Sequence, residues 1–260
     1  MNRPNNIPSI SAVIITKNEQ EVIEDCLKSI AWVDEIILVD DFSSDDTVKI
    51  AKKYTRNVFL HKLQTLGKQK QFALDKARGD WIIMLDADER IAESLKKEVI
   101  EAVSKGNFDA YNVYFHQFFL GQPLVPTLSG GHPRIFKRGL GKIIPDAIHE
   151  KIVINGSIGQ LKTPIIHLSH RSLSQLISKF NHFTDKEAKI MFEHGSRVGK
   201  LTIISSLIHN FWIRQKVYQD YKSGIRGLVL TSLFLIYHFL KWIKIWELQT
   251  LVKDGKKRNH

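Results

Sequence analysis

Short apolar runs alternate with amphipathic stretches along the first hundred residues of the chain. Four runs are too short for a solitary helix and rich in strand formers: 11–16, 35–41, 57–62 and 81–85. The stretches between and after them space their apolar residues as helices do: 18–31, 43–54, 67–77 and 93–104. Strands that alternate with helices of about a dozen residues predict an α/β fold with a mostly parallel, Rossmann-like sheet flanked by helices.

The fourth apolar run ends in a group of carboxylates. Residues 81–85 are apolar on both faces, as in a central strand that is covered on both sides, and Asp86, Asp88 and Glu89 follow at once. Ligands of open α/β sheets bind at the carboxyl ends of the strands. Carboxylates this close repel one another unless a cation or a proton intervenes. The pattern favours Mg²⁺, which carboxylates and substrate phosphates hold together; a solvated acidic loop is the alternative.

Polar residues also follow the first two strands. Thr16, Asn18 and Glu19 stand at the end of the first, and Asp40 lies at the end of the second. Neither strand leads into a G-x-G-x-x-G fingerprint or a P-loop. Three converging strand ends suit a nucleotide held by carboxylate hydrogen bonds to its base and ribose. On this interpretation Asp40 accepts the imide N–H of a uracil; an acid favoured by the dipole at a helix N-terminus fits the spacing equally.

The amino-acid composition of the sequence changes after Asp109. The stretch 110–121 is aromatic and strand-like, whereas 121–141 is rich in proline and glycine and is predicted to form loops. Because loops on a rigid scaffold commonly carry specificity, this half is expected to recognise an acceptor. Its candidate polar residues are Arg134, His149, Glu150, His167 and His170.

From residue 173 onward the chain is predicted to be helical, with strongly apolar stretches at 201–217 and 225–251. The longest run without a charged residue or histidine, 227–237, has 11 residues and is short of the ~20 that span a bilayer. The second stretch contains cations and tryptophans among its apolar residues: Arg226, Lys241, Trp242, Lys244 and Trp246. This composition is typical of a helix that lies in the plane of a membrane interface. A helix that completes the protein's own core or a dimer interface is the alternative.

Composition narrows the class of protein. A hydrophobic content of 43% and a charged content of 25% over 260 residues are ordinary for a globular protein and argue against global disorder. The single cysteine, Cys26, excludes a disulfide framework and a Cys-rich zinc site, and fits a reducing compartment. The first ten residues contain no apolar signal core, so secretion is not expected.

The net charge of +11 is concentrated near the C-terminus. Residues 196–260 contain 12 Lys and Arg against 3 Asp and Glu. A basic excess can indicate nucleic acid, an anionic membrane or an anionic substrate as partner. Here the cations are interleaved with apolar residues, while the carboxylates gather in the core half. An anionic membrane surface is therefore the expected partner, and no nucleic acid is expected.

Several segments together resemble the family 2 glycosyltransferases. In the first half they are ISAVIITKNEQEVIEDCLKSI, EIILVDDFSSDDT, KQKQFAL and GDWIIMLDADE. The likeness continues through PRIFKRG, the step Ile148-His149-Glu150, HLSHRS and YHFLKWIKIWE, and is similar to bacterial lipopolysaccharide-core glucosyltransferases. The resemblance implies the GT-A nucleotide-diphospho-sugar transferase fold with a C-terminal amphipathic helical extension. It also implies inverting, metal-dependent transfer.

The resemblance assigns residues to the donor site position by position. Thr16, Asn18 and Glu19 match nucleotide contacts after the first strand, and Asp40 matches the acid that binds the base. Lys70 matches a basic residue that lies near the donor. The next position, usually Asn in the family, is Gln71 here, which puts a direct contact by that residue in doubt.

The resemblance also assigns the catalytic residues. Asp86-Ala87-Asp88 matches the DXD motif, in which the second acid coordinates Mg²⁺ or Mn²⁺ and the first reaches the ribose or the metal. Glu150 matches the position of the base, although many family members carry a Glu-Asp pair there. Whether His149, His167 or His170 ligates the metal is left open.

The expected function is transfer of a hexose, with glucose from UDP-glucose as the first candidate, onto a lipid-linked saccharide of the lipopolysaccharide core or another surface glycan. The expected domains are residues 1–172, split into a donor half, 1–108, and an acceptor half, 109–172, followed by a membrane-associated extension, 173–260. The expected location is the cytoplasmic face of the bacterial inner membrane, as a peripheral protein. The alternatives are a nucleotidyltransferase that makes an activated sugar, and a basic membrane- or nucleic-acid-binding module without catalysis.

Overall fold

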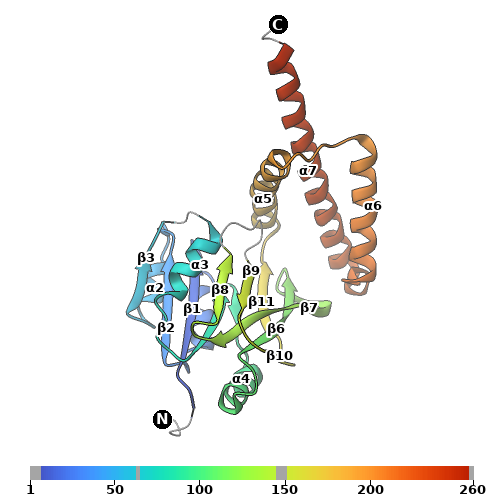
Figure 1. Cartoon of the computed structure of the whole chain (residues 1–260). Coiled ribbons are helices and arrows are strands. Elements are labelled where there is room, and N and C mark those ends of the chain that lie inside the picture. Colours follow the sequence, from blue (N-terminus) through green and yellow to red (C-terminus); the bar gives the residue numbers. More distant parts are fainter. Residues whose placement is uncertain (1–6, 63–64, 145–150, 258–260) are drawn as a thin grey trace. The chain divides into compact units, whose positions relative to one another are not determined.

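The computed structural model describes residues 7–62, 65–144 and 151–257 of the chain (Figure 1). The chain forms two compact units. The first contains residues 1–117 and 128–169, and the second contains 118–127 and 170–260. The domain boundary expected at residue 172 stays a prediction; in the structure, residues 118–127 group with the C-terminal helices rather than with the rest of the sheet.

The first half of the chain builds the parallel part of the sheet. Its strands are β1 (Ile10–Thr16), β2 (Glu35–Asp40), β3 (Asn57–Leu60) and β4 (Trp81–Asp86). They lie in the order β3-β2-β1-β4, and each neighbouring pair is parallel. The helices of this half are α1 (Ile23–Ser29), α2 (Thr47–Ala51), α3 (Leu66–Leu74) and α4 (Glu93–Lys105). The predicted α/β fold with a Rossmann-like sheet is confirmed.

The second half extends the sheet with strands of mixed direction. These are β5 (Glu89–Arg90), β6 (Ala110–Phe119), β7 (Gln122–Lys137), β10 (Ile158–Gln160) and β11 (Ile165–His170). From β4 the order continues β7-β6-β11-β5, and β10 pairs with β6. A separate antiparallel pair consists of β8 (Gly141–Ile144) and β9 (Lys151–Ile154).

The prediction of loops over 121–141 is wrong for most of that stretch, which forms β7. Its antiparallel register with β4 runs through Ile135, Phe136 and Lys137, a part of β7 without proline. Ile135 and Phe136 are buried. The prolines of the stretch therefore leave the ladder with β4 intact, and apolar burial outweighs the loop-like composition.

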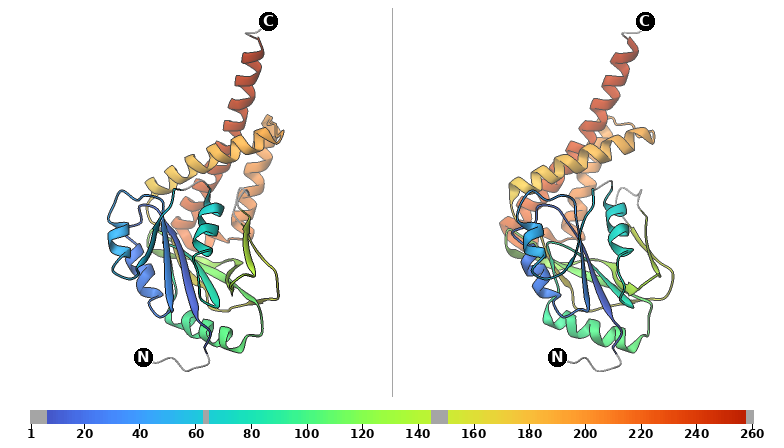
Figure 2. Two further views of the ribbon diagram at one scale, coloured as in Figure 1. Left: turned by 60° about the vertical axis from the view of Figure 1, so that its left-hand side comes forward. Right: turned by 90° about the vertical axis from the view of Figure 1, so that its left-hand side faces the viewer.

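The side chains of the parallel strands alternate between two cores. On β1, Ile10, Ala12 and Ile14 face the core that contains α1, α2 and α4, while Val13 faces the core that contains α3, β8 and β9. Figure 2 shows α1 and α2 on one side of the sheet and α3 on the other. Because β1, β2 and β4 are buried on both faces, they read as continuous apolar runs in the sequence, whereas β3 at the edge of the sheet is only partly buried.

The second unit is helical. It contains α5 (Leu173–Glu193), α6 (Lys200–Lys216), a 3₁₀ turn η1 (Asp220–Ser223) and α7 (Gly224–Lys257). The hydroxyl of Ser172 caps α5 by accepting a hydrogen bond from Gln175 N. The segment Asp220–Val252, 33 residues, is long and apolar enough to cross a membrane by length and composition.

Candidate functional site

Parallel pairing brings the polar ends of three strands into one row. Thr16, the last residue of β1, lies opposite Asp40, the last residue of β2. On the other side, Ile15 lies opposite Asp86, the last residue of β4. The three predicted strand ends therefore meet at one edge of the sheet, where open α/β folds bind ligands.

The loops after β1 and β2 are clasped together by hydrogen bonds. Asn18 N donates to Ser43 Oγ at 2.7 Å, and Asn18 Oδ1 accepts from Ser44 N at 2.8 Å. Glu19 N donates to Thr47 Oγ1 at 2.8 Å. Asn18 adopts a left-handed backbone conformation with φ 53°, which asparagine tolerates better than most residues. Asn18 thus holds the loop in shape through its side chain, and any contact with a nucleotide would be added to that role.

Asp40 is fully buried, and both of its carboxylate oxygens accept hydrogen bonds from Ser43. Ser43 N donates to Oδ1 at 2.7 Å, and Ser43 Oγ donates to Oδ2. Both hydrogen bonds join Asp40 to the residue three positions further on and shape the loop after β2. Each carboxylate oxygen keeps a further lone pair, and the assigned contact between Asp40 and a base stays a prediction.

Thr16 presents a buried polar atom at the same edge. Its side chain is 6% exposed, and its Oγ1 has no hydrogen-bond partner in the part of the chain that the structure describes. Buried hydroxyls are usually hydrogen-bonded. An orphaned hydroxyl in this row is a polar group that a bound ligand can satisfy.

At the end of β4 two cations meet two carboxylates. Lys70 Nζ, on α3, lies 3.1 Å from Asp86 Oδ1. Arg134 Nη2, on β7, lies 3.4 Å from Asp86 Oδ2 and 2.9 Å from Glu89 Oε1. Glu89 Oε2 accepts a hydrogen bond from Asp86 N at 2.9 Å. The structure therefore brings the predicted Lys70 and Asp86 into direct contact and adds Arg134 and Glu89 to them.

The charges of this network respond to burial in opposite ways. Burial opposes ionisation of Asp86, yet the Lys70 ammonium and the Arg134 guanidinium hold the pKa of Asp86 well below its usual range. Burial raises the pKa of Glu89 to about 7, although the Arg134 guanidinium pulls it down. Asp86 therefore carries its negative charge at neutral pH between two cations.

Asp88 follows in the turn between β4 and β5 and is 8% exposed. Its Oδ1 lies 3.5 Å from Nε2 of His167, which comes from β11, the strand paired with β5. Burial disfavours the imidazolium form, but the hydrogen bond to Asp88 and the charges of Asp88, Glu89 and Asp86 together outweigh burial and raise the pKa of His167. His167 Nδ1 has no hydrogen-bond partner among the described residues.

The donors at this edge fit a hard divalent cation. Asp86 and Asp88 supply carboxylate oxygens, and Mg²⁺ is commonly held by one or two carboxylates together with substrate phosphates. Asp86 is already neutralised by Lys70 and Arg134, so Asp88 is the better-placed donor of negative charge. Among the described residues, no three His, Cys, Asp or Glu side chains are placed to hold a metal ion together.

The predicted base lies outside the described residues. Glu150 belongs to 145–150, as does His149, and the assignment of Glu150 stays a prediction. The side chain of His170 is likewise not described. The strand before this segment is anchored by Gln71, whose Oε1 accepts a hydrogen bond from Ile143 N at 3.0 Å. Gln71, where the family usually has Asn, therefore ties α3 to β8 in this chain.

The sequence signal was weakest for Glu89 and Arg134. The sequence marks Glu89 only as one of three clustered acids, and it predicts for Arg134 a contact with phosphates or a surface salt bridge rather than a buried ion pair. The structure buries Glu89 completely and pairs it with Arg134, 45 residues along the chain. The sequence alone could not predict this pair, because pairing over that distance depends on the β4–β7 register.

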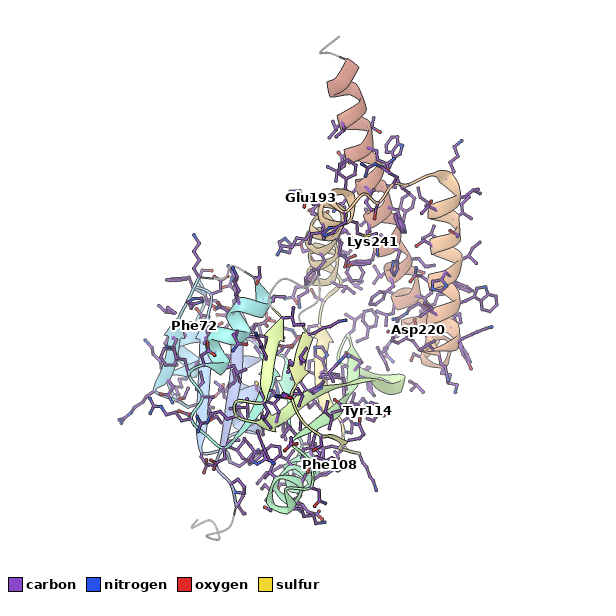
Figure 3. All side chains as sticks on the ribbon, viewed as in Figure 1. Phe72, Phe108, Tyr114, Glu193, Asp220 and Lys241 are labelled. Atoms are coloured by element: carbon purple, nitrogen blue, oxygen red, sulfur yellow. The ribbon has the colours of Figure 1, made fainter. Side chains whose placement is uncertain are left out.

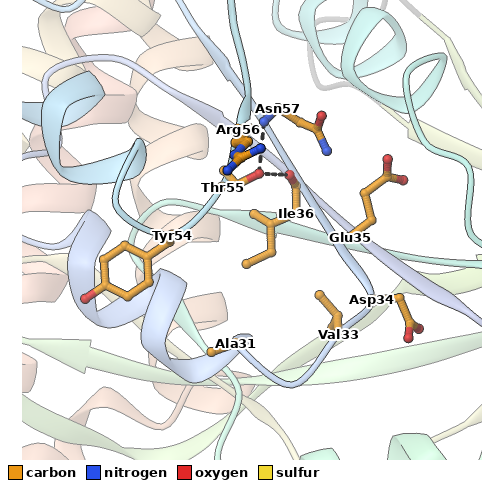
Figure 4. Close-up of a pocket in the computed structure, with 9 residues that line it drawn as sticks. All are labelled: Ala31, Val33, Asp34, Glu35, Ile36, Tyr54, Thr55, Arg56 and Asn57. Atoms are coloured by element: carbon orange, nitrogen blue, oxygen red, sulfur yellow. Dashed lines mark hydrogen bonds between the residues drawn. The ribbon is translucent and has the colours of Figure 1, made fainter.

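A hollow of about 420 Å³ lies at the opposite end of the strands. The residues that line it lie at the start of β2 and β3 and include Glu35, Ile36 and Asn57 (Figure 4). Thr55 Oγ1 donates to Ile36 O and accepts from Asn57 N there. This hollow is separate from the row of Thr16, Asp40 and Asp86, which lies at the carboxyl ends of the same sheet.

Comparison with known proteins identifies relatives over most of the chain. The model of a family described as "Glycosyl transferase family 2" matches residues 11–155, more than half of the chain. An uncharacterized glycosyltransferase of Rickettsia conorii is 28% identical over 258 residues, covering 92% of this chain and 90% of the relative. The lipopolysaccharide core biosynthesis glycosyltransferase LpsC of Rhizobium meliloti is 24% identical and covers 93% of each chain.

Two solved structures resemble this one. A mannosyltransferase from Pyrobaculum calidifontis, in complex with GDP-Man and Mn²⁺, has a TM-score of 0.51 at 14% identity and covers 93% of this chain and 88% of its own. TarS of Staphylococcus aureus, residues 1–349 with UDP-GlcNAc, has a TM-score of 0.50 at 18% identity and covers 95% of this chain and 92% of its own. At these identities the likeness shows the fold alone, which is that of the GT-A glycosyltransferases.

Proposed function

The chain belongs to glycosyl transferase family 2, and we propose that it transfers a hexose from UDP-glucose onto a lipid-linked saccharide of the lipopolysaccharide core or a related surface glycan. The observation that carries the proposal is the row of Thr16, Asp40 and Asp86 at one sheet edge, with two cations beside Asp86. The relative LpsC, named for lipopolysaccharide core biosynthesis, supports the class of acceptor. The alternatives of a nucleotidyltransferase or a non-catalytic basic module gain no support from the comparisons.

In this proposal the strand ends bind the donor. Thr16, Asn18, Glu19 and Asp40 contact the nucleoside, and the orphaned hydroxyl of Thr16 gains a partner. Lys70 offers positive charge to the diphosphate and can exchange part of its pairing with Asp86 for the phosphates. The UDP-GlcNAc and GDP-Man that the two similar structures contain support a nucleotide-sugar donor of this general kind.

Asp88, with Asp86, would hold a divalent metal, Mg²⁺ or Mn²⁺. Bound there, the ion supplies Lewis-acid stabilisation of the departing diphosphate. The Mn²⁺ of the mannosyltransferase complex supports such an ion in a protein of this fold. His167, in contact with Asp88, orients that carboxylate.

Transfer itself is a single in-line displacement with inversion. The acceptor hydroxyl oxygen forms a bond to C1 of the hexose while the bond from C1 to the phosphate oxygen breaks, and UDP leaves with that electron pair. The carboxylate of Glu150 takes the proton of the hydroxyl, a contribution of typically ~10²–10⁴-fold. The helical unit holds the enzyme at an anionic membrane, on the cytoplasmic face of the bacterial inner membrane, where a lipid-linked acceptor is found.

The test is a nucleotide-release assay on a panel of UDP- and GDP-sugars with a lipopolysaccharide-core acceptor, with Mn²⁺, with Mg²⁺ or with EDTA. We expect turnover with UDP-glucose that requires the metal, and a loss of about 100-fold or more in Asp88→Ala, since metal stabilisation is worth several kcal/mol. Glu101→Gln, which removes an exposed charge on α4, is the matched control and should keep full activity.

Turnover that survives both EDTA and Asp88→Ala would remove the metal from the proposal. Glu150→Gln separates the base from the donor site, because it should lose turnover while UDP affinity stays unchanged. If Glu150→Gln turns over as fast as the wild type, the base is another residue. Release from a GDP-sugar in preference to every UDP-sugar would contradict the proposed donor.

A further inference from the structure

The helices α6 and α7 turn apolar side chains outward. Along α6, Leu201, Ile204, Ile208 and Trp212 follow helical spacing on one face and are 81%, 54%, 55% and 53% exposed. The outward face of α7 is of the same kind, with these exposed residues: Ile225, Leu228, Ile236, Phe239 and Trp246. A surface helix of a water-soluble protein shows the opposite arrangement, with its apolar stripe toward the core.

The inner face of α6 carries a row of polar side chains beside Ile203, which packs in an apolar cluster with Val198 and Ile245. Thr202, Ser206, Asn210 and Arg214 recur every four residues and therefore lie along one side of the helix. Asn210 Nδ2 donates to Ser206 O at 2.8 Å, within this row. We call these four residues, together with the groups of α7 and η1 that they contact, the polar seam.

The polar seam joins α6 to α7 and η1 in an antiparallel register. Trp242 Nε1 donates to Ser206 Oγ at 2.7 Å, and Gln215 Nε2 donates to Thr231 Oγ1 at 3.3 Å. At the turn, Arg214 makes a two-point ion pair with Asp220, at 2.6 and 2.9 Å. Arg214 is 8% exposed and Asp220 is 4% exposed, so this ion pair is buried. Figure 3 shows Asp220 at the turn between α6 and α7.

Two cations of α7, Lys241 and Lys244, are turned inward as well, whereas Arg226 near its start is exposed. Lys241 Nζ lies 3.4 Å from Glu187 Oε2 of α5, and Lys244 Nζ lies 2.8 Å from Asp185 Oδ1. The two lysine side chains are only 15% and 17% exposed. Lys241 and Lys244 interrupt the apolar run in the sequence, which is why the sequence favoured a helix lying flat at the interface. In the folded unit these charges do not break the outward apolar face.

This inversion of polarity is what a lipid environment requires. Between helices in a membrane, small and polar side chains hydrogen-bond across the interface, because apolar contact gains little over contact with lipid. Charged residues there face the bundle interior and pair with one another. In water the same arrangement would leave apolar surface exposed, at about 25 cal/mol per Å², while charges are buried at a cost.

The two ends of the helix pair carry exposed cations and aromatic residues. Lys216 and Lys222 flank the turn, together with Tyr218 and Tyr221, which are 43% and 62% exposed. At the other end the register places Val198 beside Gln249, so Lys200 and Trp246 lie there. Lys, Arg, Tyr and Trp are the residues that anchor helix ends among headgroups. The 17 residues of α6 span roughly 25 Å, close to the ~30 Å of a hydrocarbon core.

We propose that α6 and α7 form an antiparallel hairpin immersed in the acyl layer of a membrane, with the polar seam sealed between them and the cationic ends among anionic headgroups. The outward residues contact lipid chains directly, so the attachment is integral rather than peripheral. This concerns the membrane partner of the proposed function but is independent of the reaction. A second copy of the chain is the other occupant that could cover the apolar face, and the experiment below distinguishes the two.

The test uses the full-length chain with Cys26→Ser and one new cysteine carrying an environment-sensitive fluorophore. Ile208→Cys and Ile236→Cys probe the outward faces of α6 and α7, which are 55% and 50% exposed there. Gln175→Cys and Ser178→Cys on α5 are the matched controls, because they are exposed polar positions of the same unit. Each protein is reconstituted into vesicles of phosphatidylethanolamine and phosphatidylglycerol.

We expect nitroxide-labelled acyl chains to quench the probes at 208 and 236 by about half or more, as lipid-facing positions should be, and aqueous iodide to leave them unaffected. The α5 probes should respond to iodide and not to the acyl nitroxide. Iodide quenching at 208 and 236 in vesicles would overturn the proposal. Protection from both quenchers, with cross-linking between chains, would overturn it in favour of a second copy.

Extraction of the unlabelled protein from vesicles is a second test, which does not depend on the folding of the labelled variants. The unlabelled wild-type protein in the same vesicles should resist extraction by high salt and by alkaline carbonate, whereas a peripheral protein is released. Release by carbonate would contradict immersion. UDP binding by the same preparation reports on the first unit separately, so failure of the hairpin proposal and failure of the proposed function give different results.

Discussion

The ion pair between Glu89 and Arg134 is the most deeply buried charge pair at the sheet edge. Glu89 is fully buried, and the Arg134 side chain is 12% exposed and stacks 5.0 Å from the ring of Phe115. Arg134 also touches Asp86, so one guanidinium serves two carboxylates. Asp86 is ionised at neutral pH, so loss of the guanidinium would leave that carboxylate with Lys70 alone, and it would leave Glu89, whose pKa burial already raises to about 7, without its partner.

Arg134→Met should therefore destabilise the protein by about 3–5 kcal/mol. The measurement is urea unfolding, followed by tryptophan fluorescence, to which the buried Trp81 of the first unit contributes. In the double variant Arg134→Met with Glu89→Gln the buried group is neutral, and much of the lost stability should return. Equal losses in the single and the double variant would show that the packing of Arg134 on Phe115, rather than its charge, carries the effect.

At the residue scale, the sequence predicts the positions of site residues that depend on local patterns, but not the contacts that depend on pairing between distant segments. Asp86 and Asp88 follow a buried strand directly, so their position at the sheet edge could be inferred from the sequence. The hydrogen bonds between Asp40 and Ser43 join residues only three positions apart, so they too could be inferred from the sequence. Lys70 was assigned only through the family resemblance, and its contact with Asp86 depends on how α3 packs on the sheet.

Asp109 links the ends of three strands through hydrogen bonds and an ion pair. It precedes β6, accepts hydrogen bonds from Ser157 N and Oγ just before β10, and pairs with Lys137 Nζ at the end of β7 at 2.7 Å. The hydrogen bonds from Lys137 and Ser157 lower the pKa of Asp109 to about 2, against an ordinary value of 3.8. Protonation of Asp109 should therefore weaken the joint between these strands.

A carboxyl whose pKa is lower in the folded state adds stability that is present above its unfolded pKa and lost as the pH falls through the folded one. The window for Asp109 runs from about pH 4 down to about pH 2. Asp109→Asn should have a smaller decline in its free energy of unfolding between pH 5 and pH 2 than the wild type. Denaturant titrations at each pH measure this, with Asp75→Asn at the exposed end of α3 as the control. The same decline in all three proteins would exclude Asp109 as the source.

At the element scale the sequence pattern was sufficient for the parallel half and insufficient for the rest. Strands buried on both faces stand out as apolar runs, so β1 to β4 were predicted at nearly their observed bounds. The stretch that forms β7 has a loop-like composition, and its strand character depends on pairing with β4 far away in the chain.

At the scale of the whole molecule, the two compact units follow opposite rules of polarity. The first unit buries its apolar runs in two cores on either face of a sheet. The second exposes large apolar side chains on α6 and α7 and pairs their charges internally. Charge counts along the sequence indicated a membrane partner, but the direction in which each cation points could be known only from the fold.

The central claim is that the carboxyl ends of β1, β2 and β4 bind a nucleoside diphosphate with a divalent cation at Asp88. Calorimetric titration of UDP into the full-length protein, with and without Mn²⁺, tests this most directly. We predict binding that is strengthened by Mn²⁺ in the wild type and in the control Glu101→Gln. In Asp88→Asn the Mn²⁺-dependent gain should disappear, a loss of about tenfold or more for one carboxylate ligand. UDP binding by Asp88→Asn in Mn²⁺ that equals the wild type would contradict the account.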